Sequence, residues 1–334
     1  MGLFVIYTSC YKDQPAVTLE SGQLRAQFLP SHGGKLCSLL VKSQQFDLLV
    51  QRPGEHYRVQ PYGGVYVDGE CSGFDDMFPT IDTCHYERYP WQGIQLPDHG
   101  EVWSVPWAHS IDNDGGRDQL HMSTYGVRLP YRLDKAAYFS DESTLRIDYT
   151  LSNLSAFEFD FLWAAHPMLV LDEGAQLILP ASVSKVVTVF DSNAGLGRYG
   201  DEFAWPLATL DDGHQRDLSR MSPKSVGRAA KYYVKGPLSE GWCKLTYPAH
   251  RLELMMAFPA DKVPYLGVLP NEGGWADLYN IFLEPATASF DRPDVARLRG
   301  ECSHVAAGGT YTWHLTFSID ANESTLYGKS IRSK

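Results

Sequence analysis

The stretch LRIDYTL at residues 145–151 alternates apolar or aromatic side chains with polar ones, and this pattern decides the fold. Successive side chains of a β-strand point to opposite faces, so a strand with one buried face has a period of two. A helix would need apolar residues three and four positions apart, which this stretch does not supply. The stretch therefore indicates a strand that covers a core with one face.

The same alternation recurs at residues 157–163, 252–258 and 311–319. Turn-forming Asn, Pro and Gly residues separate the segments, and the sequence contains no repeat of fixed period and no linker-like segment. Many strands without a boundary between them favour one large sandwich over two domains. The sequence thus predicts an all-β fold, a large antiparallel β-sandwich with few short helices, of which residues 219–232 are the best candidate.

We expect the whole chain, residues 1–334, to form a single domain. Its core should extend from about residue 17 to residue 319. Residues 320–334 lose apolar content, which indicates a loosely docked polar tail.

The chain carries 29 basic and 40 acidic residues, a formal net charge of −11, and no long basic run. This balance argues against a nucleic-acid or anionic-membrane partner. The apolar stretches are too short to span a bilayer, and residues 1–15 lack the pattern of an export signal, so we expect a cytoplasmic location. The six cysteines include no C-x-x-C pair, which favours buried free thiols over zinc or redox chemistry.

Two polar segments of the first third of the chain could carry chemistry. In GFDDMFP at 73–79, Asp75 and Asp76 can bind hydroxyl groups or a cation, or cap their own turn. In PDHGEVW at 97–103, His99 and Glu101 would project from the same side of a strand, like half of a metal site. Because no further ligand completes that set, we expect no metal, and His99 is either functional or a hydrogen-bonded core residue.

Two further candidates lie at strand ends. His166 follows an aromatic alternation and precedes a proline, which favours an extended backbone, and it is either functional or a satisfied core histidine. Glu284 ends the apolar stretch 278–284, where loss of hydration would raise its pKa toward the range of a general base, unless it emerges into solvent. One glutamate and two histidines form a plausible acid–base set.

Several common enzyme signatures are missing. The sequence has no G-x-S-x-G elbow, no Walker-type loop and no G-x-G-x-x-G that opens a helix after a strand. Glycoside hydrolysis by paired carboxylates stays open, with Glu284 and one of Asp75, Asp76 or Glu101, because the sequence does not give their separation.

The order of these motifs resembles the galactose mutarotase-like (aldose 1-epimerase) superfamily over residues 17–319. The Gly-Gly-Lys at 33–35 resembles the glycine turn of the family's first strands. The His-Gly at 99–100 and the His-Pro at 166–167 resemble its two active-site histidines, and the Glu-Pro at 284–285 resembles its catalytic glutamate. The motifs are short, so their order and their β context carry the resemblance.

The resemblance implies a β-supersandwich with a sugar cleft on its concave face. By this resemblance Glu284 removes the proton of the anomeric hydroxyl, His166 protonates the ring oxygen, and His99 forms a hydrogen bond to the sugar. The ring opens, C1 rotates, and closure gives the other anomer. No metal or organic cofactor is implied. The expected partner is a monosaccharide or modified sugar, bound by a monomer or homodimer.

Four more residues are candidate sugar contacts: Asp75 and Asp76 through their carboxylates, Trp103 as an aromatic platform, and Lys231 toward a hydroxyl or an anionic group. Relatives that act on phosphosugars continue the His-Gly motif with an arginine, whereas this chain has EVW at 101–103, which argues against a phosphosugar. Another anionic group, bound by the basic segment 216–235, stays open.

Two other functions also stay open at this point. One is a carbohydrate-binding protein without catalysis, and the other is a hydrolase or lyase of oligosaccharides, because one fold hosts many functions.

Overall fold

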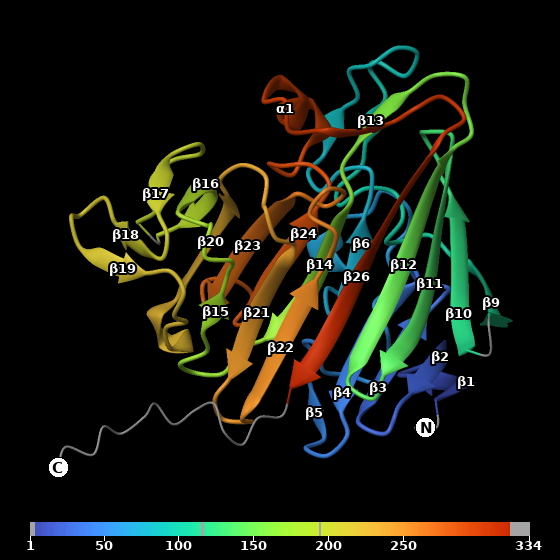
Figure 1. The fold of residues 1–334 in the computed structure, drawn as a ribbon, viewed down its shortest axis with the longest axis horizontal. Helices are drawn as coiled ribbons and strands as arrows, with labels where there is room; N and C mark the ends of the chain where they lie inside the picture. Colours follow the sequence, from blue (N-terminus) through green and yellow to red (C-terminus); the bar gives the residue numbers. More distant parts are fainter. Residues whose placement is uncertain (1–3, 115–116, 194, 321–334) are drawn as a thin grey trace.

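Two antiparallel sheets pack face to face in this computed structural model, which describes residues 4–114, 117–193 and 195–320 (Figure 1). Over these residues the larger sheet has twelve strands, in the order β1 (Val5–Tyr11), β2 (Gln14–Glu20), β3 (Leu24–Leu29), β4 (Lys35–Val41), β6 (Phe74–Met77), β14 (Ala164–Val170), β24 (Tyr279–Ala286), β23 (Tyr265–Glu272), β20 (Arg228–Val234), β16 (Lys185–Ser192) and β17 (Glu202–Ala204), with β5 (Phe46–Asp47) beside β4.

The second sheet has eight strands over the same residues, in the order β15 (Leu177–Ile178), β21 (Trp242–Tyr247), β22 (Leu252–Ala257), β26 (Thr310–Asp320), β12 (Thr144–Asn153), β11 (Tyr131–Asp141), β10 (Arg117–Tyr125) and β9 (Ala108–Asp114). The remaining elements are short: the strand pairs β13 (Phe159–Phe161) with β25 (Ser303–Val305), β18 (Leu207–Thr209) with β19 (Gln215–Asp217) and β7 (Cys84–His85) with β8 (Gln95–Leu96), the helix α1 (Pro293–Leu298), and the 3₁₀ turns η1 (Tyr66–Asp68) and η2 (Lys224–Val226).

The alternating segments form the predicted strands. The stretch 145–151 lies in β12, where Leu145, Ile147, Tyr149 and Leu151 are all buried. The segment 311–319 lies in β26, which pairs with β12, and the segment 252–258 lies mainly in β22, which pairs with β26. Their buried faces meet the larger sheet; for example, the rings of Phe74 on β6 and Phe317 on β26 have centroids 5.6 Å apart. The all-β prediction is confirmed.

Three local predictions are wrong. The expected helix at 219–232 is the turn η2 followed by strand β20, because Pro223 and the left-handed Gly227 interrupt it. The segment 97–103 is a series of turns rather than a strand. Of the alternation at 157–163 only the residues of β13 are strand.

Several other expectations have simple outcomes. All six cysteines are free, and four of them are buried. Among the described residues, none of the helices is long and apolar enough to cross a membrane. The predicted polar tail lies outside the described residues beyond Asp320, which ends β26.

Strand β24 connects the core to the opposite face of the larger sheet. Ile281 and Leu283 are buried in the main core between the sheets. Phe282 belongs to a separate cluster on the other side of β24, and Glu284 shares its side because two positions separate them. This outer face of the larger sheet carries the candidate site.

Candidate active site

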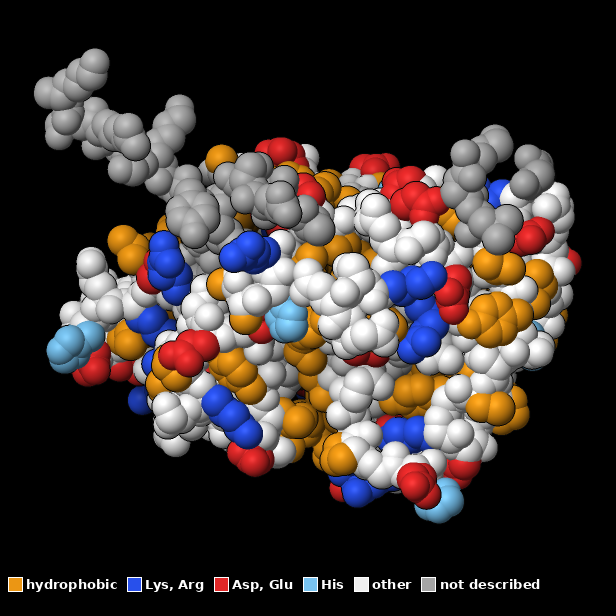
Figure 2. Space-filling view, turned by 90° about the horizontal axis from the view of Figure 1, so that it is seen from below, with side chains coloured by type: hydrophobic (Ala, Val, Ile, Leu, Met, Phe, Trp, Pro, Cys, Tyr) orange, Lys and Arg blue, Asp and Glu red, His pale blue; other side chains and the backbone are white. Residues whose placement is uncertain are grey.

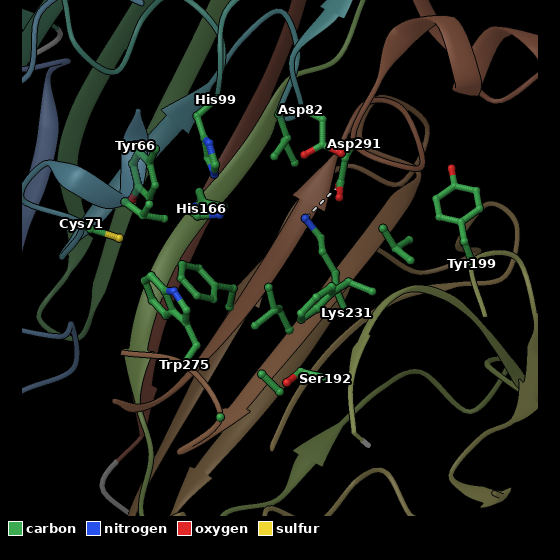
Figure 3. A pocket seen from close by; sticks show the side chains of 18 residues that line it. Tyr66, Cys71, Asp82, His99, His166, Ser192, Tyr199, Lys231, Trp275 and Asp291 are labelled. Atoms are coloured by element: carbon green, nitrogen blue, oxygen red, sulfur yellow. Dashed lines mark ion pairs between the residues drawn. The ribbon is translucent and has the colours of Figure 1, made fainter. Parts of the chain in front are cut away.

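Three titratable side chains lie on one face of the larger sheet, and Figure 3 shows two of them, His166 and Lys231. His166 is on β14, Glu284 is on the adjacent β24, and Lys231 is on β20. All three are nearly or fully buried. Strand pairing therefore brings together residues that are far apart in the sequence.

Strand β23 lies between Glu284 and Lys231, and the residue of β23 opposite Glu284 is Gly267. A Cβ at Gly267 would lie 3.0 Å from Glu284 Oε2 and 3.2 Å from a ring carbon of Tyr233 on β20. The missing side chain leaves the space in which Lys231 reaches across β23 to Glu284.

A cavity of about 480 Å³ lies over this face. His99, His166 and Lys231 line it, while Glu284 lies behind them with no exposed surface. In Figure 3, His99 and His166 lie together on one side of the cavity and Lys231 points toward Asp291 on the other. This volume is typical of a site for a small molecule, for which about 300–1,000 Å³ is usual.

Glu284 is the centre of the polar network. Its Oε2 lies 2.6 Å from Lys231 Nζ, and its Oε1 lies 3.5 Å from His166 Nε2. Lys231 Nζ also pairs with Asp291 at 2.8 Å. Glu284 Oε1 and His166 Nδ1 have no hydrogen-bond partner among the described residues. Buried polar atoms rarely stay unsatisfied, so these atoms are ready to bind a polar ligand.

Burial and charge set the protonation of the network. Burial raises the pKa of Glu284 to about 7, against the pull of the Lys231 ammonium. Burial, together with the neighbouring cationic groups, holds the pKa of His166 well below its usual value. Burial disfavours the charge of Lys231, but Asp291 and Glu284 outweigh it and raise the pKa of Lys231. A carboxyl that titrates near neutrality beside an imidazole suits proton transfer.

His99 completes the site from the turn after β8. Its ring stacks on Tyr66 at 4.2 Å between centroids and stands edge-on to His166 at 5.2 Å. Its Nδ1 is 2.8 Å from a carboxylate oxygen of Asp98, a contact that fixes the ring and leaves Nε2 as the other polar atom.

The backbone at the position after His99 requires a glycine. Gly100 has a φ of 78°, and a Cβ there would lie 2.3 Å from the carbonyl oxygen of Phe78. His99 itself has a φ of 58°, and its backbone N–H donates to the carbonyl of Ile81 at 2.6 Å. This close contact between two backbone segments places the imidazole of His99 at the cavity.

Two acids at the cavity are missing from the sequence-based set. Asp82 and Asp291 both line it. The carbonyl of Asp291 accepts the backbone N–H groups of Ile81 and Asp82, and Tyr233 donates its hydroxyl to Asp291 Oδ1 at 2.7 Å. Burial and the neighbouring Asp291 raise the pKa of Asp82. Both acids lie in loops, so no period in the sequence could place them.

Three predicted sugar contacts do not line the cavity. Asp75 pairs with Lys35 at 2.7 Å and accepts a hydrogen bond from Tyr66, which lines the cavity in its place. Asp76 belongs to the opposite face of β6, where Lys135 is its partner at 2.7 Å. Trp103 is buried and stands edge-on to Tyr66. Asp75 and Trp103 therefore contact Tyr66 from outside the cavity lining.

Contrary to the prediction from the sequence, His99 and Glu101 do not project from the same side of a strand. Glu101 turns away from His99 and accepts hydrogen bonds from the hydroxyls of Tyr62 and Tyr131 and from the backbone at 127 and 128. In the part of the chain that the structure describes, no group of three His, Cys, Asp or Glu side chains is arranged to hold a metal ion.

The fold is similar to those of several solved structures. A protein from Klebsiella pneumoniae provisionally named an aldose 1-epimerase has a TM-score of 0.70 and 13% identity, over 96% of this chain and 85% of that chain. A galactose mutarotase-like protein from Clostridium acetobutylicum has a TM-score of 0.67 and 13% identity, over 95% and 98%. A galactose mutarotase-like protein from Lactobacillus casei has a TM-score of 0.64 and 14% identity, over 91% and 100%.

At the level of sequence, neither a protein-family model nor a curated protein matches the chain. The structural similarity nevertheless covers almost the entire length of this chain and of its neighbours. The chain therefore has the galactose mutarotase-like fold, as the resemblance of its motifs predicts.

Proposed function

We propose that the protein is an aldose 1-epimerase-like isomerase, which interconverts the α and β anomers of a neutral hexose or modified hexose. The observation that supports this proposal is the 3.5 Å approach of His166 Nε2 to Glu284 Oε1 beside a cavity of small-molecule size. An acid–base pair of this kind is what ring opening at the anomeric carbon requires.

The proton transfers use Oε1 of Glu284, because Oε2 is occupied by Lys231. The reactive form of the site carries its single proton on His166 and none on Glu284, so that Glu284 takes the proton of the anomeric hydroxyl while His166 gives its proton to the ring oxygen. The C1–O5 bond breaks, C1 rotates, and closure from the other face returns both protons. His99 and Lys231 line the cavity and bind the sugar hydroxyls.

Charge at the site supports a neutral substrate. Lys231 is the only Lys or Arg among the described residues that line the cavity, and it already pairs with two carboxylates. An anionic group placed there would lose hydration without gaining a free cation.

The basic segment 216–235 is also neutralised. Arg216 and Arg228 pair with Glu272, and Lys235 pairs with Glu202. On the face shown in Figure 2, basic and acidic side chains are interspersed. This segment offers no cluster of unpaired charge for an anionic sugar.

The test follows the anomeric equilibration of freshly dissolved α-aldopyranoses by NMR or polarimetry over a panel of sugars. Wild-type protein should accelerate at least one of them, and Glu284→Gln should not. The enzymatic proposal fails if no sugar equilibrates faster with wild type than with Glu284→Gln. Saturable binding without acceleration would instead indicate a carbohydrate-binding protein, and new reducing ends from oligosaccharides would indicate a hydrolase.

A further inference from the structure

The cavity has two chemically different halves. The titratable side chains described above form one half, while apolar side chains, called the apolar wall here, make up most of the other half. The wall adjoins the acid–base pair directly, since the rings of Phe282 and His166 have centroids 4.4 Å apart. Its main members are Val189, Leu269, Trp275 and Phe282.

Trp275 is held in this wall by a dedicated contact. The side chain of Asn271 accepts the backbone N–H of Trp275 at 2.9 Å and donates to its carbonyl at 3.0 Å. Asn271 also donates to Asn280 on the neighbouring strand at 2.9 Å, and both asparagines are fully buried. Two buried amides therefore fix the position of one tryptophan.

The loop that carries Trp275 adopts an unfavourable backbone. Ala276 and Asp277 have φ values of 52° and 53°, in the left-handed region that residues with a Cβ rarely adopt. Gly274 packs so closely on β20 that a Cβ there would lie 2.3 Å from the carbonyl carbon of Arg228. Strain of this kind persists where surrounding contacts enforce it, and it is concentrated at binding sites.

The space beside this wall exceeds what a bare pyranose fills. The cavity of about 480 Å³ lies within the range of about 300–1,000 Å³ that holds drug-sized ligands. A hexopyranose has only six carbons and six oxygens, and its apolar ring face can cover a single aromatic side chain, so the rest of the apolar half would have no complementary partner. An apolar group attached to the sugar would bury that wall favourably.

We propose that the apolar half, with Trp275 as its platform, is a subsite for an apolar substituent of the sugar. The substrate class is then a neutral aldose with a free anomeric centre in which one hydroxyl or amino group carries an acyl or similar apolar group. This inference rests on the proposed function for the position of the sugar ring, which it places against the polar half.

The test is the dependence of affinity on the length of the substituent. Calorimetry would compare glucose with 6-O-acetyl-, propanoyl- and butanoyl-glucose and with the same series of 2-N-acyl glucosamines. Each CH2 buried should improve affinity by about fourfold, so the butanoyl sugar of the productive series should bind about 16-fold more tightly than the acetyl sugar.

Variants locate the effect. Trp275→Ala should reduce the gain to less than about twofold per CH2, whereas Trp275→Phe, which keeps an aromatic ring, should retain most of it. Tyr89→Ala is the matched control, because Tyr89 is an aromatic residue 67% exposed and outside the cavity lining; it should leave the gain unchanged.

Two results would overturn the subsite: affinities that do not rise with chain length in either series, or a rise that Trp275→Ala leaves intact. Mutarotation measured on the same sugars separates this inference from the proposed function. A chain-length effect without acceleration of any sugar would contradict the isomerase activity and support the subsite. Acceleration without a chain-length effect would support the isomerase activity and contradict the subsite.

Discussion

Two buried carboxylates of the larger sheet show how the same ion pair can serve structure or chemistry. Asp76, between the sheets, pairs with Lys135 at 2.7 Å and accepts the indole N–H of Trp163 at 2.9 Å. Glu284, on the opposite face, pairs with Lys231 at 2.6 Å through Oε2, but its Oε1 has no hydrogen-bond partner within the described chain.

The surroundings of the two ion pairs also differ: one is enclosed by protein and the other borders a cavity. The Lys135 ammonium also donates to the carbonyl of Gly34 at 2.8 Å, so the Asp76 pair is satisfied and closed. The Glu284 pair borders a cavity, and burial raises the pKa of Glu284 to about 7. A satisfied pair specifies packing, whereas an unsatisfied pair at a cavity is prepared for a ligand.

The largest expected effect separates the two regions by activity. His166→Gln should reduce the acceleration of mutarotation by about 10²–10⁴-fold, the usual contribution of one general acid–base group. Because His166 Nδ1 has no hydrogen-bond partner within the described chain, folding should depend little on it. Kinetics and thermal unfolding of the purified variant test this, and a large loss of stability with activity retained would contradict the comparison.

The next effect concerns stability at the closed pair. Asp76→Asn leaves Lys135 as a buried charge without its counter-ion and should lower the free energy of unfolding by about 3–5 kcal/mol. Urea unfolding measures the loss. The double variant Asp76→Leu/Lys135→Met removes both charges and should recover most of it, and equal losses in the two variants would show that the pair is not the cause.

The pH dependence tests the open pair. The active form holds one proton on Glu284 and His166 together, and the higher apparent pKa of the pair is that of Glu284, about 7. As pH rises above this value the proton is lost, and kcat/KM should fall about tenfold per pH unit. A pH-rate profile of wild type checks the sign, since a rate that instead increases through pH 7 would mean that only a deprotonated Glu284 is needed.

The smallest effect is a shift in the pH at which kcat/KM begins to fall. The Lys231 ammonium lowers the pKa of Glu284, so Lys231→Met should move the fall in kcat/KM to higher pH. The Asp291 carboxylate raises that pKa, so Asp291→Asn should move the fall to lower pH. Removing one nearby charge changes a pKa by about one to three units. The pH-rate profile of each variant, measured under the same conditions, tests this prediction. Shifts in the same direction would contradict the assigned network.

The strands of the site were predictable because a period of two is a local signal. The alternation at 278–284 by itself predicts that Phe282 and Glu284 share one face, and β24 has that arrangement. His166 and His99 were recognisable from short motifs, and the structure places them beside Glu284.

The remainder of the site depends on contacts that no local pattern contains. Trp275 is positioned by side-chain contacts of Asn271 and Asn280 within an irregular turn, and Asp291 by a loop that the distant Tyr233 holds. Trp103 follows His99 by four residues, yet the left-handed turn at His99 and Gly100 directs its indole into the protein, and Trp275 lines the cavity instead.

The glycine at position 267 gives the sheet an unusual dependence. A central strand normally contributes to a site through the side chains it presents, but here β23 contributes by presenting none opposite Glu284. A gain of even one methyl group at this position would crowd Glu284 Oε2 and the ring of Tyr233, and one of them would have to shift. The catalytic carboxylate is therefore held in place by an atom that the strand does not have.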